Sequence, residues 1–200
     1  FCVEKLKFKA VSLFTGISAV CCMIPAINVL LSGNVISKSF DINNLFGTVN
    51  VVIDPLAAFF IVVISFMSFM ASIYANGYMK HYLDKNMNTS SHCLFLTLLF
   101  ASMLAVVTVQ NALMFLIVWE IMSLSSFFLV IFEDNKKEVL SAGIKYLIYM
   151  HVSVIFIILA FVLMVANSGN LDFASFKTVL ENNAGLANLA FILAFIGFGI

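Results

Sequence analysis

Residues 111–130 read NALMFLIVWEIMSLSSFFLV, and this stretch decides the fold class. About 20 mostly apolar residues are enough to cross the roughly 30 Å hydrocarbon core of a bilayer as a helix. Because lipid offers no partner to backbone N–H and C=O groups, such a stretch must be helical throughout. The sequence therefore predicts an all-α fold in which this stretch is one membrane span.

The rest of the chain repeats the pattern. We expect about six spans in a polytopic transmembrane helix bundle, with the last one only beginning before the chain stops. Phe1 stands where Met is expected, and the chain stops within an apolar run. Residues 1–200 are therefore expected to be the N-terminal part of one larger membrane domain. The predicted spans lie near residues 10–32, 54–76, 92–109, 112–132, 141–165 and 187–200.

Composition supports a membrane protein and excludes several other classes. Hydrophobic residues make up 63% of the chain and charged residues 10%, against about 45–50% and 25% in soluble domains. The net charge is zero. These values exclude a soluble globular enzyme, a disordered tail and a basic nucleic-acid binder. The four cysteines lack metal-ligand spacing, and no nucleotide-binding or hydrolase motif is present, so we expect no catalytic residues, metal site or cofactor in this chain.

The connections between spans carry their own signals. Residues 33–53 contain β-prone pieces separated by Gly and Asn, which favour a small hairpin. Gln110 and Asn111 are predicted to form a tight turn between two spans. Residues 171–182 are predicted to form a short amphipathic surface helix with Asp172 as its N-cap.

The lysines are unevenly divided between the two sides of the predicted bundle. Seven fall on one side and two on the other, and Lys145 lies inside a span. Because cytoplasmic loops carry the excess of lysine, the seven-lysine side is predicted to be cytoplasmic in a multi-pass cell-membrane protein. The seven are Lys5, Lys7, Lys9, Lys80, Lys85, Lys136 and Lys137, and the two are Lys38 and Lys177.

Glu120 is the strongest candidate for a functional residue. It lies about 13 Å into its span, close to mid-membrane, where an ionisable side chain costs roughly 2.5–3.5 kcal/mol on insertion scales. A carboxyl that is desolvated and near a cation can be poised to exchange protons. The alternative is a fixed ion pair between helices. Ser123, one turn further on the same face, is a possible supporting residue.

The next span carries Lys145 and His151. Lys145 shares one side of the helix with Ser141 and Tyr149, and its pKa would shift readily on burial, although its stem is also long enough to reach the membrane surface. His151 lies near the middle of the span and suits a proton relay, or else a hydrogen-bonded packing role. Asp54, before Pro55, is a weaker candidate that N-capping of a helix explains.

At Trp119 and Glu120 the sequence resembles the antiporter-like, proton-conducting membrane subunits of respiratory complex I, the Mrp-type antiporters and the membrane-bound hydrogenases. Leu116–Val130 is most similar to the large membrane subunit of hydrogenase-4 and formate hydrogenlyase. Weaker similarities to the same family occur at Val52–Leu56, Tyr74–Met79, Gly143–Tyr146 and Asn170–Phe173.

The resemblance implies a mechanism. In this family a glutamate of the fifth helix pairs with a lysine of an interrupted seventh helix, and changes in that pairing move protons in response to redox chemistry elsewhere in the complex. Glu120 matches the glutamate, Lys145 matches a lysine of the sixth helix, and His151 falls where the family carries a polar residue. The paired lysine is expected just after Ile200.

The expected function is therefore proton translocation, or Na⁺/H⁺ exchange, in a non-catalytic subunit of an NADH:quinone oxidoreductase or hydrogenase-type complex. The expected partners are other membrane and hydrophilic subunits, the lipid bilayer and the transported ion, without nucleic acid. Two alternatives stay open: a Mrp-type cation/proton antiporter, and a structural membrane anchor whose Glu120 only fixes helix packing.

Overall fold

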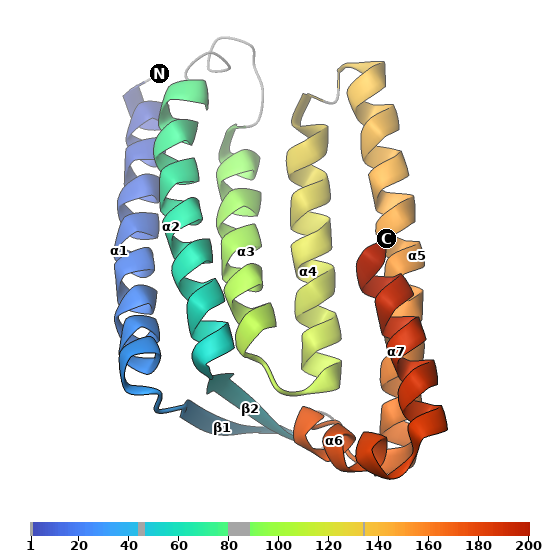
Figure 1. The fold of residues 1–200 in the computed structure, drawn as a ribbon. Coiled ribbons are helices and arrows are strands. Elements are labelled where there is room, and N and C mark those ends of the chain that lie inside the picture. The colour runs from blue at the N-terminus through green and yellow to red at the C-terminus, as the bar shows by residue number, and fades with distance from the viewer. Residues whose placement is uncertain (1, 44–46, 80–88, 134) are drawn as a thin grey trace. The chain divides into compact units, whose positions relative to one another are not determined.

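The computed structural model describes residues 2–43, 47–79, 89–133 and 135–200. Within these ranges it contains seven α-helices and one two-stranded sheet (Figure 1). The chain divides into two compact units, of which unit 1 comprises Phe1–Ser37 and Val52–Thr108, and unit 2 comprises Lys38–Val51 and Val109–Ile200. Lys80 and Lys85, which belong to the predicted cytoplasmic side, lie outside the described residues.

Unit 1 contains three long apolar helices, α1 (Cys2–Ser32), α2 (Pro55–Tyr78) and α3 (Thr89–Thr108). The start of α2 follows from local chemistry, because the side chain of Asp54 accepts a hydrogen bond of 2.7 Å from the backbone N–H of Ala57. Pro55 occupies the first helical position, where its missing N–H leaves no hydrogen bond unmade.

Small and polar side chains hold α1 against α2. Apolar packing alone gains little between helices in lipid, so close contact and interhelical hydrogen bonds decide which faces meet. The hydroxyl of Ser12 donates to the backbone oxygen of Ser72 at 2.8 Å, and the Asn76 amide donates to Ser12 Oγ at 2.5 Å. At the other end of the pair, Ala26 and Ala58 are fully buried in a shared apolar cluster.

Unit 2 contains α4 (Ala112–Val130), the 3-10 turn η2 (Ile131–Glu133), α5 (Lys137–Ser168) and the shorter apolar α7 (Ala184–Gly199). Five helices of the described chain are long and apolar enough to cross a membrane. The predicted class, an all-α polytopic membrane helix bundle, is confirmed.

The predicted hairpin between the first two spans is confirmed as β1 (Ile36–Asn43) paired with β2 (Gly47–Ile53). The tight turn predicted at Gln110 and Asn111 is wrong. These residues are extended, because Gln110 N–H donates to the backbone oxygen of Asn50 at 2.9 Å, and Asn111 pairs as an isolated bridge with Asp172. The segment between α3 and α4 thus forms its backbone hydrogen bonds with neighbouring segments of the chain.

Asp172 joins three parts of unit 2. One oxygen of its carboxylate accepts from Ala174 N–H at 2.9 Å and so caps α6 (Phe173–Asn182), as the sequence predicts. The other oxygen accepts from the Asn50 amide of β2 at 2.5 Å. The backbone of the next residue, Phe173, donates to Gln110 at 3.0 Å. We call this set of contacts the Asp172 junction.

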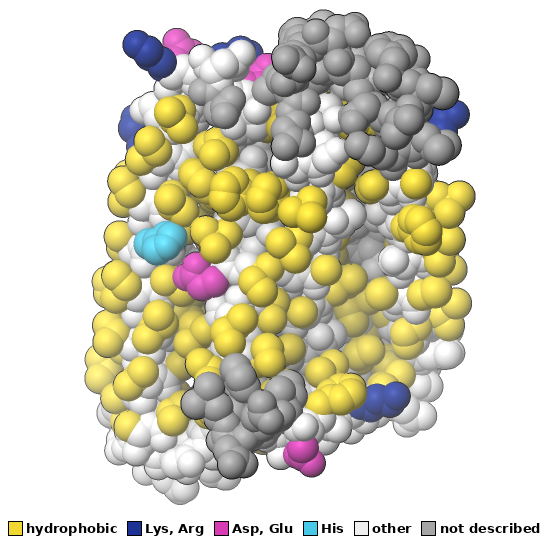
Figure 2. Space-filling view, turned by 180° about the vertical axis from the view of Figure 1, so that it is seen from behind, with side chains coloured by type: hydrophobic (Ala, Val, Ile, Leu, Met, Phe, Trp, Pro, Cys, Tyr) yellow, Lys and Arg dark blue, Asp and Glu magenta, His cyan; other side chains and the backbone are white. Residues whose placement is uncertain are grey.

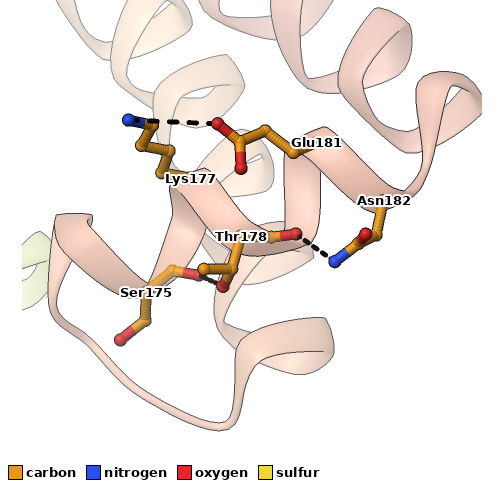
Figure 3. Close-up of polar contacts among 5 residues, drawn as sticks. All are labelled: Ser175, Lys177, Thr178, Glu181 and Asn182. Carbon is orange, nitrogen blue, oxygen red and sulfur yellow. Dashed lines mark hydrogen bonds and ion pairs between the residues drawn. The ribbon is translucent and has the colours of Figure 1, made fainter.

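Helix α6 is amphipathic, as predicted. Phe176 is 7% exposed and packs in a cluster with Met164 of α5 and Ala190 of α7. Polar side chains bond along the helix instead, and Lys177 lies 3.9 Å from Glu181 (Figure 3). The amide of Asn182 donates to the backbone oxygen of Thr178 at 2.8 Å, also drawn there.

Glycines set the spacing of the helices that pack on α5. A Cβ atom added to Gly197 of α7 would lie 2.7 Å from Ile157 Cγ1 and 3.0 Å from the backbone nitrogen of the same residue. At this crossing the hydroxyl of Ser153 donates to the backbone oxygen of Gly197. The two backbones are therefore in direct contact, as small residues allow in membrane helices.

Gly197→Ala is expected to destabilise the protein by about 1–3 kcal/mol, because the backbone of α5 cannot move away as a flexible side chain can. Gly199→Ala is the matched control, since nothing lies within 4 Å of its added Cβ. Thermal unfolding of the full-length protein in detergent measures both variants. Equal unfolding temperatures for the two would contradict the close contact of α5 and α7.

Asp172→Ala is expected to cost about 1–3 kcal/mol, because it removes a helix cap and leaves the buried side of Asn50 without an acceptor. Glu181→Ala serves as the control, since its pair with Lys177 is exposed and exposed pairs contribute little. Thermal unfolding measures both variants. If the Glu181 variant loses as much stability as the Asp172 variant, the stabilising role of the Asp172 junction is contradicted.

Candidate functional site

Glu120 is the ninth residue of the 19-residue α4, about 13 Å from the helix start. Its side chain is half-buried in unit 2. Within the described ranges its carboxylate makes neither a hydrogen bond nor an ion pair. A charged side chain at the centre of a span has a high insertion cost, so Glu120 is an unusual residue at this position.

The packing of α4 on α5 fixes what lies opposite Glu120. A Cβ on Gly143 of α5 would lie 3.5 Å from Phe127 of α4, and closer still to Ile131. The two helices run antiparallel, joined by the short segment after α4 (Figure 1). Glu120 precedes Phe127 by seven residues, which is about two turns, so both side chains lie on the α5-facing side of α4.

Ile131 is the nearest contact of Gly143, and eleven residues, the distance from Ile131 to Glu120, lead along α5 to Val154. The pairing of Phe115 with Phe161 at 5.5 Å agrees with this register, so His151 lies about one helical turn from the level of Glu120. The imidazole Nδ1 of His151 lies 2.9 Å from the backbone oxygen of Leu147, and the ring is exposed. The face seen in Figure 2 is largely hydrophobic, and an acidic and a histidine side chain interrupt it between the helix ends.

Lys145 is not brought to this level. It follows Gly143 by two residues, which turns it by about 200° around α5 and away from α4. Lys145 and the predicted supporting residue Tyr149 are both exposed in unit 2. Any effect of the Lys145 charge on Glu120 must therefore act through space instead of by contact.

The two other predicted supporting residues have structural partners. Ser123 is buried, and its hydroxyl donates to the backbone oxygen of Trp119 at 2.8 Å. Asp54 caps α2 through Ala57, which is the structural alternative given for it from the sequence.

Trp119 is a residue whose role the sequence did not reveal. Its indole ring stacks on Phe115 at 5.6 Å and meets Phe198 of α7 edge-on at 5.3 Å. The indole nitrogen is buried and donates no hydrogen bond within the described chain. In the sequence, only its position directly before Glu120 drew attention to Trp119. The structure shows that its indole N–H lies in an aromatic cluster formed by α4 and α7.

No group of three or more His, Cys, Asp or Glu side chains in the described ranges is arranged to hold a metal ion. A carboxyl and an imidazole are side chains that can each bind and release a proton.

Comparison with known families identifies the family of the chain. Residues 109–200 match the family model described as "NADH:quinone oxidoreductase/Mrp antiporter, TM", and residues 40–89 match "NADH-Ubiquinone oxidoreductase (complex I), chain 5 N-terminus". The chain belongs to this antiporter-like family. The second match begins within β1 and covers β2 and α2, and the first covers all the helices of unit 2, Glu120 and His151 included.

Individual relatives support the assignment. The chain is 42% identical over 146 residues to hydrogenase-4 component B of Escherichia coli (strain K12), covering 73% of this chain and 21% of that protein. It is 26% identical over 163 residues to subunit 5 of the chloroplast NAD(P)H-quinone oxidoreductase of Zygnema circumcarinatum, covering 78% and 23%. The chain thus spans about a fifth of the length of these curated relatives.

Solved structures share the fold. The Mrp complex from Dietzia sp. DQ12-45-1b contains a chain that superposes with a TM-score of 0.75 at 16% identity, covering 98% of this chain and 23% of that one. The antiporter-like fold inferred from the sequence is therefore shown.

The absence of a described partner for Glu120 generates a stability prediction. Glu120→Leu is expected to leave the unfolding temperature unchanged or to raise it, because the change removes a desolvated carboxyl and no described contact. Asp54→Ala is expected to lower stability by about 1 kcal/mol through loss of the α2 cap. Thermal unfolding of the full-length protein separates the two. If Glu120→Leu lowers the stability more than Asp54→Ala does, Glu120 forms an ion pair that stabilises the fold.

Proposed function

We propose that this chain contributes the proton-binding site of an ion-translocating membrane subunit in a complex I-like or hydrogenase-type oxidoreductase. The observation that carries the proposal is the position of Glu120, half-buried at mid-span and without a hydrogen bond or ion pair in the described ranges. Such a charge has an insertion cost that apolar packing would avoid, so its presence favours function over packing.

Each candidate residue has a role in this proposal. Glu120 takes up and releases the proton, and His151, about one turn from its level on α5, relays it. Lys145 acts from the far side of α5 as a charge that biases the protonation of Glu120. Ser123, Tyr149 and Asp54 support the helices that carry these groups. Electron transfer takes place in other subunits, and this chain needs no cofactor for its part.

The proposal extends to partners and location. The relatives named above are, by their names, a component of a hydrogenase and a subunit of a quinone oxidoreductase. We therefore place this chain among other membrane and hydrophilic subunits in a cell membrane, with the lysine-rich loops on the cytoplasmic side. The transported ion is H⁺, or Na⁺ exchanged for H⁺.

A second candidate function is cation/proton antiport of the Mrp type. The shared fold with the Mrp complex and the wording of the family model favour it. The two functions differ in their driving force, which is electron transfer in the first and an ion gradient in the second. A purely structural anchor is the remaining alternative.

Glu120→Gln in the full-length protein, assembled in its complex and reconstituted in sealed vesicles, is expected to reduce redox-driven proton uptake at least about tenfold, because the amide cannot exchange a proton. Electron transfer recorded in parallel shows whether the complex is intact. Glu133→Gln is the matched control, since Glu133 lies in η2, after the end of α4, and pairs with Lys136 at 2.6 Å. This variant is expected to pump normally.

The other outcomes discriminate between the candidates. Normal uptake by the Glu120 variant rejects Glu120 as the proton site. Loss of assembly instead of uptake favours the structural anchor. Proton movement driven by a Na⁺ gradient without an electron donor, and abolished by the same variant, favours the antiporter.

A further inference from the structure

Three helices of unit 2 meet beside Glu120. Val154 of α5 lies at the level of Glu120, and Ser153 is the residue before it. On α7, Phe198 meets Trp119 edge-on, with 5.3 Å between the ring centroids, and Trp119 directly precedes Glu120. The position of α7 therefore bears on the α4 segment that carries the proposed proton site.

A single hydrogen bond joins α5 to α7 at this level. Ser153 is 3% exposed, and its hydroxyl donates to the backbone oxygen of Gly197. Within the described residues no other hydrogen bond connects these two helices. Ser153 thus differs from three other buried serines, whose hydroxyls donate within their own helices. The three are Ser102, Ser123 and Ser125.

The sequence of α7 does not by itself fix how this helix is rotated. Its residues are apolar except for Asn188, so the helix has no polar side to direct its packing. In lipid the apolar faces are nearly equivalent, because lipid tails are as apolar as the side chains. Gly197 allows the two backbones to come close, and the directional bond from Ser153 fixes the rotation and depth of α7 at this point.

The next residue of α7, Phe198, carries the effect of this bond to α4. Its ring contacts two α4 side chains edge-on, Trp119 at 5.3 Å and Phe115 at 6.2 Å between ring centroids. These two rings stack on each other at 5.6 Å. A rotation or shift of α7 along α5 would move Phe198 away from the turn of α4 that ends at Glu120.

We propose that Ser153 is a positioning residue for proton translocation, whose hydroxyl holds α7 so that Phe198 stays packed on the α4 segment carrying Glu120. Ser153 acts through Phe198 and Trp119 and does not bind the proton. The inference rests on the proposed function, because it assigns Ser153 a role at the Glu120 site. Displacing a reacting group by about 1 Å can cost about a hundredfold in rate, so loss of this bond is expected to be measurable.

The number of protons taken up per electron transferred tests this role. A loss of stability or of assembly lowers both quantities together, whereas a displaced proton site lowers their ratio. Ser153→Ala, Ser153→Val and Ser153→Thr are made in the full-length protein, assembled in its complex and reconstituted in sealed vesicles. Val and Thr have nearly the same shape, and only Thr retains the hydroxyl.

The ratio is expected to fall at least about threefold in the Ala and Val variants, and to stay within about twofold of wild type in the Thr variant. Ser102→Ala is the matched control. Ser102 is also buried, but its hydroxyl donates to the backbone oxygen of Leu99 in its own helix at 2.8 Å. This control is expected to keep the wild-type ratio.

The outcomes separate this inference from the proposed function. If Glu120→Gln reduces uptake but Ser153→Ala keeps the wild-type ratio, the role of Ser153 is rejected and the proposed function stands. Equal losses in the Thr and Val variants also reject the role of Ser153, because the added methyl groups are then responsible. If Glu120→Gln pumps normally, both the proposed function and this inference are rejected.

A density map of the Ser153→Ala complex tests the geometry directly. The ring centroids of Trp119 and Phe198, which lie 5.3 Å apart in the wild-type protein, are expected to separate by more than about 1 Å. Unchanged packing of these two rings would overturn the proposal.

Discussion

The absence of hydrogen-bonding partners in lipid is the constraint on which this structure depends. Every backbone amide in a span must pair within its own helix. Polar side chains in a span can therefore bond only to nearby backbone oxygens or to other polar side chains. The buried hydroxyls of Ser102, Ser123 and Ser125 accordingly bond to their own helices. The hydroxyl of Ser153 bonds across to α7, and asparagine and serine join α1 to α2. Against this background the buried polar atoms that make no hydrogen bond in the described chain stand out, and they include Ser65 Oγ, Asn76 Oδ1 and the indole nitrogen of Trp119. The half-buried carboxylate of Glu120 makes none there either.

Sequence reasoning succeeded where the determinant is local. The five long helices, the hairpin, the amphipathic α6 and the caps at Asp54 and Asp172 all follow from residues within one or two turns of each other. The predicted turn at Gln110 and Asn111 failed because the partners of those residues come from β2 and from the start of α6, more than 50 residues away in each direction.

The arrangement of the candidate site also lay beyond local reasoning. Which α5 residue stands at the level of Glu120 is set by the contact of Gly143 with Phe127 and Ile131, and no periodicity in either span encodes that register. The sequence named Glu120, Lys145 and His151 as separate candidates. It could not show that His151 lies about one turn from the level of Glu120, while Lys145 is turned to the far side of α5.

The Asp172 junction has a mechanical consequence for α4. Asn111 caps the first turn of α4 while its backbone pairs with Asp172, and Ala112 N–H donates to the backbone oxygen of Leu171 at 2.8 Å. The beginning of α4 is thus fastened to α6 and the hairpin, whereas its other end passes into a short 3-10 turn. A force applied to this helix would be resisted at its first turn, so the helix would tilt by moving its η2 end. Glu120, near the middle of α4, would then be displaced more than the first turn and less than the η2 end.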